Sequence, residues 1–363
     1  MKVIHRYILT LTLKNLLLAL LLFLILFLIF DFFDRIDDLV SGGASLGLMA
    51  SYFIYKVPYM LTNMLPVAML VATMFTVGIL AKNSEITAMR ASGLTIFWIA
   101  RPIFLVAILL SFFTIIFNET VVPYSTRRVK EIYNIDIKKK VKDGRYSQKD
   151  FWWRSGNNFY SIDTFDSRTS LLLGITKLEL NESFLASSRT EANEAHFIDP
   201  TLGWTMRGVK EYYFTPTQQI EVKTLSSLPL PIKKIPKDFY DVEKDPFTMS
   251  FVELKRFIRE QLKDGLPVSS YLADLYAKVS FPFVIFIVTL TVLPFCIVPS
   301  RTGSMAASII AGLLIAFTYY AVHSFSLALG RAEIWDPLLA AWMGNLLLGT
   351  IGLILLLGTE SPS

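Results

Sequence analysis

Residue types that could carry out chemistry are few and widely spaced in this 363-residue sequence. The three histidines, His5, His196 and His323, lie far apart, so no HExxH zinc motif exists. No Gly-Lys dipeptide occurs, which excludes a Walker A phosphate loop. The single cysteine, Cys296, permits no intrachain disulfide. We therefore expect no catalytic site, no metal site and no cofactor in this chain.

One dense group of acidic residues stands out, formed by Asp31, Asp34, Asp37 and Asp38. A lipid-modifying membrane enzyme would need several acid–base groups converging at one membrane face. No pair of a nucleophile and a base lies beside these acids in the sequence. An enzyme is therefore the weakest of the functional hypotheses.

The composition divides the chain into two kinds of segment. Hydrophobic residues make up 53% of it and charged residues 18%, which excludes a disordered chain and argues against an ordinary soluble enzyme. Residues 119–264 nevertheless hold 45 of the 65 charged side chains. This polar block carries 24 basic and 21 acidic groups, so we expect no binding of nucleic acid.

Apolar runs long enough to cross a bilayer, which takes about 20 residues, occur six times. The first run is longer than the apolar part of a signal peptide, so we expect it to be retained. The sequence predicts a membrane α-helical bundle split three and three around the insert, with boundaries at 1–118, 119–264 and 265–363. The six runs are Leu16–Phe33, Tyr52–Leu80, Thr95–Phe117, Tyr271–Val298, Met305–Leu329 and Trp335–Leu357.

Basic residues in short loops set the expected orientation, because such loops tend to stay in the cytoplasm. With the N-terminus inside, the inner segments hold seven basic residues and the outer short segments hold only Arg35 and Arg331. Both termini are then cytoplasmic and the insert faces outward. The seven inner residues are Lys2, Arg6, Lys14, Lys82, Arg90, Arg101 and Arg301.

The insert reads as short strands separated by turn residues, which favours an all-β sandwich or roll. Residues Asp199–Gly203 are expected to form a hairpin turn, and Thr248–Lys263 an amphipathic helix. The strand-like stretches are Phe151–Arg154, Phe159–Ile162, Leu171–Leu180, Ala195–Ile198, Trp204–Val209 and Ile220–Leu225.

A short polar stretch at 83–93 separates the second and third apolar runs. Ser84 can cap a short helix, Glu85 suits its N-terminal end, and Gly93 can end it. Ile86 and Met89 share one face. Such a helix could dock into a groove on a cytoplasmic partner or rest on lipid headgroups, and the residues alone do not decide between the two.

The same stretch, Ser84–Gly93, resembles the coupling helix of the LptF/LptG family of lipopolysaccharide export permeases. The likeness covers essentially the whole chain and is closer to the LptG branch. Further motifs that carry it are His5-Arg6-Tyr7-Ile8, the hairpin Gly156–Phe159, the Asp199-Pro200 turn before Trp204, and Lys278 ahead of Pro282.

The resemblance implies a permease subunit of an ABC-type transporter, with an external β-jellyroll, in the inner membrane of a Gram-negative bacterium. Its implied partners are a second LptF/LptG-type permease, a dimer of cytoplasmic LptB-type ATPases that uses ATP and Mg, a single-span LptC-type protein and an LptA-type periplasmic bridge. Lipopolysaccharide would be the substrate. The implied contacts to the ATPase are Glu85, Ala88, Met89, Arg90 and Gly93.

The resemblance also implies lipid contacts at Lys130 and Tyr320, and Arg127 and Arg128 are basic candidates beside Lys130. The three basic residues could instead form a solvated cluster at the membrane interface. Asp31, Asp37 and Asp38 stand where lysines are usual in the family. The lipid could carry fewer phosphates, a divalent cation could bridge it to the acids, or the partner permease could supply the positive charge. The acids could also merely solvate the end of the helix.

Two further expectations concern ionisable groups near the membrane. His323 is expected to be a neutral, hydrogen-bonded residue of the bundle, because it is isolated. The spacing of Asp274 and Lys278 favours a structural ion pair. The competing function for the whole chain is a membrane-anchored scaffold that recruits periplasmic proteins.

Overall fold

The computed structural model describes residues 2–137, 151–155, 157–166, 169–181, 185–199, 203–214, 220–232, 235–236, 246–263, 266–297 and 305–359. The chain forms two compact units. The first comprises residues 1–133, 246–258 and 268–363, and the second comprises residues 134–245 and 259–267. The predicted division at 119 and 264 concerns which residues lie within the membrane, and it stays a prediction.

The first unit is helical, and among the described residues six helical segments are long and apolar enough to cross a membrane, as predicted. The described helices in chain order are α1 (Lys2–Ser41), α2 (Leu46–Lys82), α3 (Glu85–Ala91), α4 (Ile96–Glu131), the π-helix η1 (Ile132–Ile137), η2 (Pro246–Thr248), α6 (Phe251–Lys263), α7 (Ser269–Ser280), η3 (Phe281–Phe283), α8 (Val284–Ile297), α9 (Met305–Arg331) and α10 (Pro337–Gly358). Only η1 and α6 among them continue into the second unit, after residues 133 and 258. Helices α7, η3 and α8 together make one span.

Side-chain caps fix where three of the spans begin. The hydroxyl groups of Ser45 and Thr95 accept hydrogen bonds from Leu48 and Trp98 at the starts of α2 and α4. Asp336 does the same for α10, whose first residue is proline. These side chains bind backbone N–H groups that have no acceptor inside the helix.

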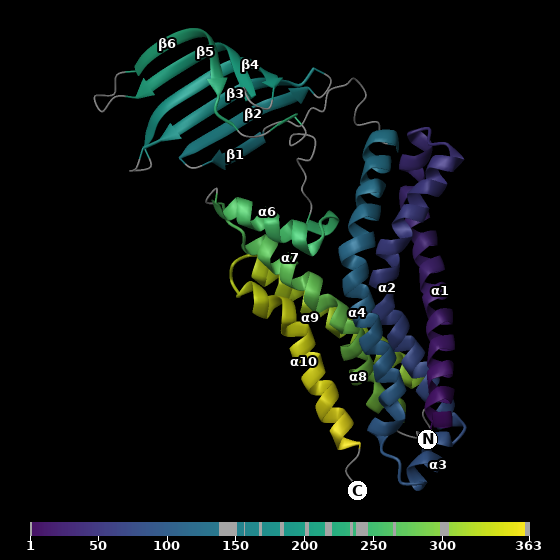
Figure 1. The fold of residues 1–363 in the computed structure, drawn as a ribbon. Coiled ribbons are helices and arrows are strands. Elements are labelled where there is room, and N and C mark those ends of the chain that lie inside the picture. Colours follow the sequence, from purple (N-terminus) through teal and green to yellow (C-terminus); the bar gives the residue numbers. More distant parts are fainter. Residues whose placement is uncertain are drawn as a thin grey trace. The chain divides into compact units, whose positions relative to one another are not determined.

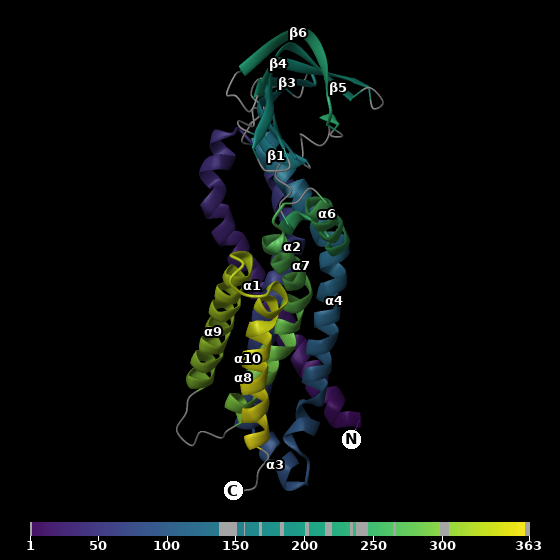
Figure 2. The same ribbon diagram turned by 90° about the vertical axis from the view of Figure 1, so that its left-hand side faces the viewer.

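The core of the helical unit lies where α2, α4 and α8 meet (Figures 1 and 2). The span that contains α8 is 72% buried within its most apolar window, whereas α1 is only 11% buried. Helix α10 approaches α8 closely at Gly352, where an added side chain would meet the backbone of Thr291. Helix α1 is therefore peripheral and presents most of its apolar surface outward.

The second unit contains a six-stranded antiparallel sheet whose strands are hydrogen-bonded in chain order (Figure 1). A membrane bundle with an inserted β domain is thus confirmed. The described strands form a single meander, without the crossovers that join two sheets. They are β1 (Phe151–Ser155), β2 (Asn158–Asp166), β3 (Leu171–Leu180), β4 (Ala186–Asp199), β5 (Gly203–Phe214) and β6 (Ile220–Leu230).

One face of the sheet carries its own apolar core, centred on the fully buried Trp204. Phe165 and Phe197 contact Trp204 edge-on, at ring-centroid distances of 6.4 and 5.2 Å. Residues 200–202 of the predicted turn, and Gly156 of the predicted hairpin, lie outside the described residues. The pairing of Ser155 with Asn158 nevertheless confirms a tight connection between β1 and β2.

Candidate functional site

The short helix α3 lies between two membrane helices and contains the residues predicted to engage an ATPase. Gly93 has a φ of 83°, and its N–H donates to the carbonyl of Arg90 at 2.9 Å, so the predicted helix end is confirmed. The predicted side-chain cap is wrong. Ser84 adopts a left-handed conformation with φ of 60°, and its hydroxyl makes no capping hydrogen bond.

One face of α3 rests on the helical core. The side chain of Ile86 is only 5% exposed and lines a small apolar pocket together with Leu80, Ile99 and Leu293. Met89 packs against the same core. These contacts join α3 to α2, α4 and α8, so a force applied to α3 acts directly on three helices of the bundle.

The carboxylate of Glu85 links α3 to the first helix. Its Oε1 accepts hydrogen bonds from the Asn83 side chain at 3.1 Å and from the Tyr7 hydroxyl of α1 at 3.4 Å. Nearby, Nε2 of His5 lies 3.2 Å from the backbone oxygen of Trp98, and the two rings pack at a tilt of 34° with centroids 4.0 Å apart. The start of α1 therefore contacts the first residue of α3 and Trp98, which follows α3 in the chain.

The structure brings the five predicted coupling residues together in α3 and the turn that follows it. Ala88, Arg90 and Gly93 are exposed, while Glu85 and Met89 are half-buried. The exposed side of α3 is thus available to another protein. The role of each residue stays a prediction. Tyr7 belongs to this site, although the sequence predicted no role for it; the family-like motif His5-Arg6-Tyr7-Ile8 is the signal that could have found it.

A second polar site lies where the C-terminal part of α1 meets the N-terminal part of α2. Asp31 forms ion pairs with Lys56 of α2 and with Arg35, the latter at 3.4 Å. The side chains of Asp31 and Lys56 are only 10% and 12% exposed. Nζ of Lys56 also donates to the hydroxyl of Tyr52 at 3.0 Å. Asp31 is therefore a buried, internally paired acid, and Lys56 is the partner that sequence reasoning missed.

The same site extends to the segment after α4. The Tyr133 hydroxyl donates to the carboxylate of Asp38, and the guanidinium of Arg35 lies 4.6 Å from the centre of the Tyr133 ring. Asp37, by contrast, is exposed. Two of the acids expected near lipid headgroups thus hold α1 against α2 and η1.

The predicted basic lipid contacts near the end of α4 have protein partners. Nε of Arg127 donates to the carbonyl of Thr248 at 3.2 Å, and its terminal nitrogen pairs with Glu253. Arg128 pairs with Glu131 on the same helix at 2.6 Å. Lys130 is partly buried. Any lipid phosphate bound at Arg127 or Arg128 would compete with these carboxylates.

Burial raises the pKa of the Glu253 carboxyl, but the opposing effects are larger. The N–H of Ser250 and the charge of Arg127 both stabilise the ionised form, so the pKa lies below its usual range. Glu253 is consequently a stable partner for Arg127 at neutral pH.

Tyr320, the predicted aromatic contact, lies on α9 and packs against Phe281 at a ring-centroid distance of 6.3 Å. Its neighbour Tyr319 donates to Asn345 at 2.9 Å, and Asn345 in turn donates to the Ser280 carbonyl at 2.8 Å. These polar groups join α7, α9 and α10 where η3 interrupts the fourth span.

His323 is buried as expected, with 7% exposure, and it stacks on Tyr319. Its Nδ1, however, has no hydrogen-bond partner among the residues that the structure describes. Asp274 binds Arg331 at 3.0 and 2.5 Å, a partner that the spacing with Lys278 did not predict. Within the described part of the chain, no three potential ligands gather into a metal site.

Comparisons with known proteins agree on one family. The family model described as lipopolysaccharide export system permease LptF/LptG matches residues 6–358. The lipopolysaccharide export system permease protein LptG of Escherichia coli (strain K12) is 24% identical over 323 residues, which is 88% of this chain and 88% of that protein. The LptG protein of Haemophilus influenzae is 23% identical over 272 residues, 74% of each chain.

Proposed function

The chain belongs to the LptF/LptG family of lipopolysaccharide export system permeases, and we propose that it is the LptG-type subunit of an ATP-driven exporter. The family match across residues 6–358 carries this proposal, together with the six apolar helices. The chain is a transporter subunit of the inner membrane that crosses the bilayer several times.

In this proposal, a dimer of LptB-type ATPases binds the exposed side of α3. Glu85, Ala88, Met89, Arg90 and Gly93 form the contact surface. The burial of Ile86 against α2, α4 and α8 supports the idea, because a helix seated on the core can transmit the movement of a bound ATPase. The absence of a Walker A sequence supports a separate ATPase subunit.

The proposed substrate is lipopolysaccharide, extracted from the inner membrane. Pulling an acyl chain out of a bilayer costs ~0.8 kcal/mol per methylene, so a lipid with several chains needs repeated work. Large apolar side chains on α1 and α9 are exposed and fit either lipid or a second permease. They include Leu18, Leu22, Leu314 and Phe317.

The remaining partners follow from the same proposal. A second LptF/LptG-type permease encloses the lipid path, an LptC-type single-span protein assists entry, and an LptA-type bridge receives the lipid. The termini are cytoplasmic and the β domain is periplasmic, an arrangement supported by seven inner and two outer basic residues.

The decisive experiment removes the acidic contact on α3. We expect Glu85→Ala to leave the complex assembled in nanodiscs while the release of lipopolysaccharide to the bridge falls at least tenfold. The reason is that truncating a half-buried interface residue removes a contact of about 1.4 kcal/mol or more. Thr350→Ala, an exposed change on α10, is the control.

Two outcomes would count against the proposal. Normal ATP-driven release by the Glu85→Ala complex would remove Glu85 from the coupling mechanism. Failure of the wild-type chain to bind a second permease or an ATPase, with retained binding of periplasmic proteins, would favour the scaffold hypothesis instead.

A further inference from the structure

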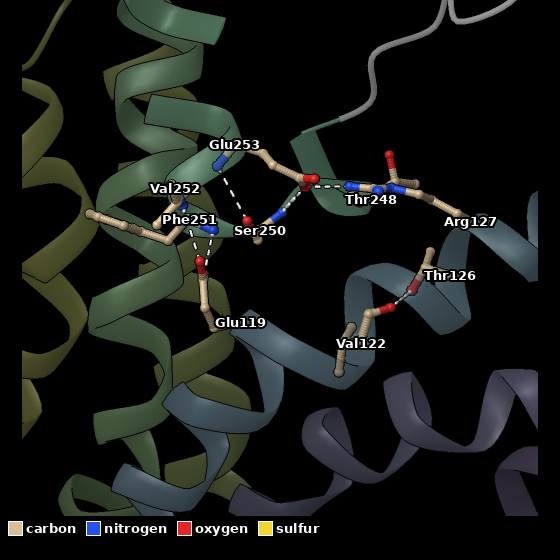
Figure 3. Close-up of polar contacts among 9 residues, drawn as sticks. All are labelled: Glu119, Val122, Thr126, Arg127, Thr248, Ser250, Phe251, Val252 and Glu253. Atoms are coloured by element: carbon tan, nitrogen blue, oxygen red, sulfur yellow. Dashed lines mark hydrogen bonds and ion pairs between the residues drawn. The ribbon is translucent and has the colours of Figure 1, made fainter. Parts of the chain in front are cut away.

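The start of helix α6 is held by side chains of α4, although the two segments lie more than 100 residues apart in the sequence (Figure 3). The N–H groups of Phe251 and Val252 donate to the two carboxylate oxygens of Glu119, at 2.6 and 3.2 Å. The first N–H groups of a helix have no acceptor within it, so Glu119 supplies a cap from another helix.

A second cap lies within the α6 segment itself. The N–H of Ser250 donates to the Glu253 carboxylate at 2.9 Å, and the N–H of Glu253 donates to the Ser250 hydroxyl at 3.2 Å. This reciprocal pair is a capping box. It also orients the Glu253 carboxylate toward Arg127 of α4 (Figure 3).

Arg127 completes the connection from the side of α4. It donates to the Thr248 carbonyl at 3.2 Å, two residues before the cap residue Ser250, and pairs with Glu253 of the capping box. We call the contacts of Glu119 and Arg127 with residues 248–253 the α4–α6 clasp.

The clasp bridges a weak point in α4. Pro123 lies midway between Glu119 and Arg127 and has no N–H, so the carbonyl of Glu119 loses its usual partner in the helix. Glu119 precedes this break and Arg127 follows it, about 12 Å apart along the axis. The first turn of α6 thus connects α4 on both sides of its interruption.

Apolar contacts hold α6 on its other side. Leu254 and Ile258 are buried, and they cluster with Met249, Val268 and Leu275 of the helical unit. Phe257 contacts Tyr271 edge-on at 5.0 Å. The start of α6 is therefore seated between α4 and α7.

Helix α4 also begins close to α3, since Thr95 caps it only four residues after Ala91. Its 36 residues would span about 54 Å. A movement at α3 must pass Pro102, which is buried, and then Pro123 before it reaches the far end of α4. Without support at Pro123, the helix could bend there and absorb the movement.

We infer that Glu119 and Arg127 are positioning residues for export, which splint α4 across Pro123 so that movement of α3 reaches α6. This inference rests on the proposed function, in which α3 receives the movement of an ATPase. Neither residue needs to contact the lipid.

The test measures coupling rather than activity alone. The full complex, reconstituted in proteoliposomes, is assayed for lipopolysaccharide released per ATP hydrolysed. Glu119→Ala is expected to lower that ratio about fivefold, the factor for the loss of one helix cap, while ATP hydrolysis continues. Glu119→Gln keeps an acceptor oxygen, so its release ratio is expected to lie between those of the wild type and Glu119→Ala. The matched control is Thr120→Ala, an exposed neighbour of Glu119 whose hydroxyl donates to the carbonyl of Ile116 within α4.

A covalent rescue separates positioning from simple stability. In a Cys296→Ser background, Glu119→Cys with Val252→Cys is joined by a short bis-maleimide. Joining is expected to restore the release ratio, and the unjoined double variant is expected to stay low.

Two results would overturn the inference. One is a wild-type release ratio in Glu119→Ala, and the other is a release ratio that stays low after the two cysteines of the double variant are joined. If Glu119→Ala does not assemble, Glu119→Gln takes its place, and a wild-type ratio in that variant also overturns the inference. A wild-type complex that releases no lipid would contradict the proposed function itself.

Discussion

Asp31 illustrates how the role of a single side chain depends on its surroundings. Its carboxylate binds Lys56 and Arg35 and is largely shielded from solvent. The sequence left several explanations open for this acid, which involved the lipid, a cation, the partner permease or solvent. None of them was an ion pair within the chain. Its other oxygen, Oδ2, has no hydrogen-bond partner among the described residues, and a contact of Asp31 with lipid or a cation stays a prediction.

Removing one member of this buried pair should destabilise the protein more than removing both. Lys56→Met is expected to lower the free energy of unfolding by roughly 3 kcal/mol, since it leaves the shielded carboxylate of Asp31 with only its longer contact to Arg35, at 3.4 Å. The double variant Asp31→Asn with Lys56→Met should recover most of that loss. Thermal unfolding of the detergent-purified chain measures both, with the exposed Asp37→Asn as control. Equal effects of the single and double variants would show that the pair is not coupled.

The second prediction at this scale concerns pH and Glu253. Because the folded state lowers the pKa of this carboxyl, ionised Glu253 contributes stability that is present above its unfolded pKa, about 4.3, and is lost as the pH falls through the lower folded value. The groups that face it are Arg127, which stays charged, and the polar Ser250.

Spin labels on Arg101→Cys of α4 and Lys255→Cys of α6 can follow this change. The distance distribution should stay constant from pH 8 to about 5 and broaden only below about pH 4. In the Glu253→Gln variant the distribution should already be broader at neutral pH, and its pH dependence should be smaller. Identical pH profiles for wild type and variant would contradict the role given to Glu253.

At the scale of elements, local signals predicted structure well where neighbours in sequence decide it. Thr95 starts α4, and Gly93 ends α3. Residues 186–194 of β4 were missed because polar residues there, such as Glu191 and Glu194, alternate with small ones rather than large apolar ones. Ser84 failed as a cap because the chain turns through a left-handed residue to leave α2.

The candidate sites were harder to predict, because they depend on pairs that are distant in the sequence. The acids and bases at Asp31, Glu85 and Arg127 were each identified from the sequence. Their partners Lys56, Tyr7 and Glu253 were not, because no local pattern relates residues 25, 78 and 126 positions apart. Only the packing of helices brings such groups together.

The interruption of the fourth span gives a prediction about an element. Asn345 of α10 satisfies the Ser280 carbonyl, which lies just before η3 and Pro282. Replacing it with leucine removes that bond and the one to Tyr319. We expect Asn345→Leu to cost about 2 kcal/mol of unfolding free energy, since buried polar groups lose their partners.

Thr350→Ala serves as the control for this change, because Thr350 is exposed and bonds only within α10. Thermal unfolding in the same detergent compares the two variants. A melting temperature for Asn345→Leu equal to that of Thr350→Ala would show that η3 does not depend on α10.

At the scale of the whole chain, the helical unit combines a short helix at one end of α4 with a clasp near the other. The core of α2, α4 and α8 connects the two. Such an arrangement suits a protein that receives movement from a separate ATPase. It requires that α3 face the cytoplasm while the loop between α9 and α10 faces outward.

That orientation can be tested with single cysteines in a Cys296→Ser background. Ala332→Cys lies in the exposed turn between α9 and α10. It should react with a membrane-impermeant maleimide added to cells whose outer membrane is permeabilised and whose inner membrane is intact. Ser92→Cys, exposed beside α3, should react only after the inner membrane is opened. The physical reason is the excess of basic residues in the loops assigned to the cytoplasm, which resist transfer across the membrane. The opposite labelling pattern would place α3 outside, out of reach of any cytoplasmic ATPase, and both the proposed function and the role of the α4–α6 clasp would then fall together.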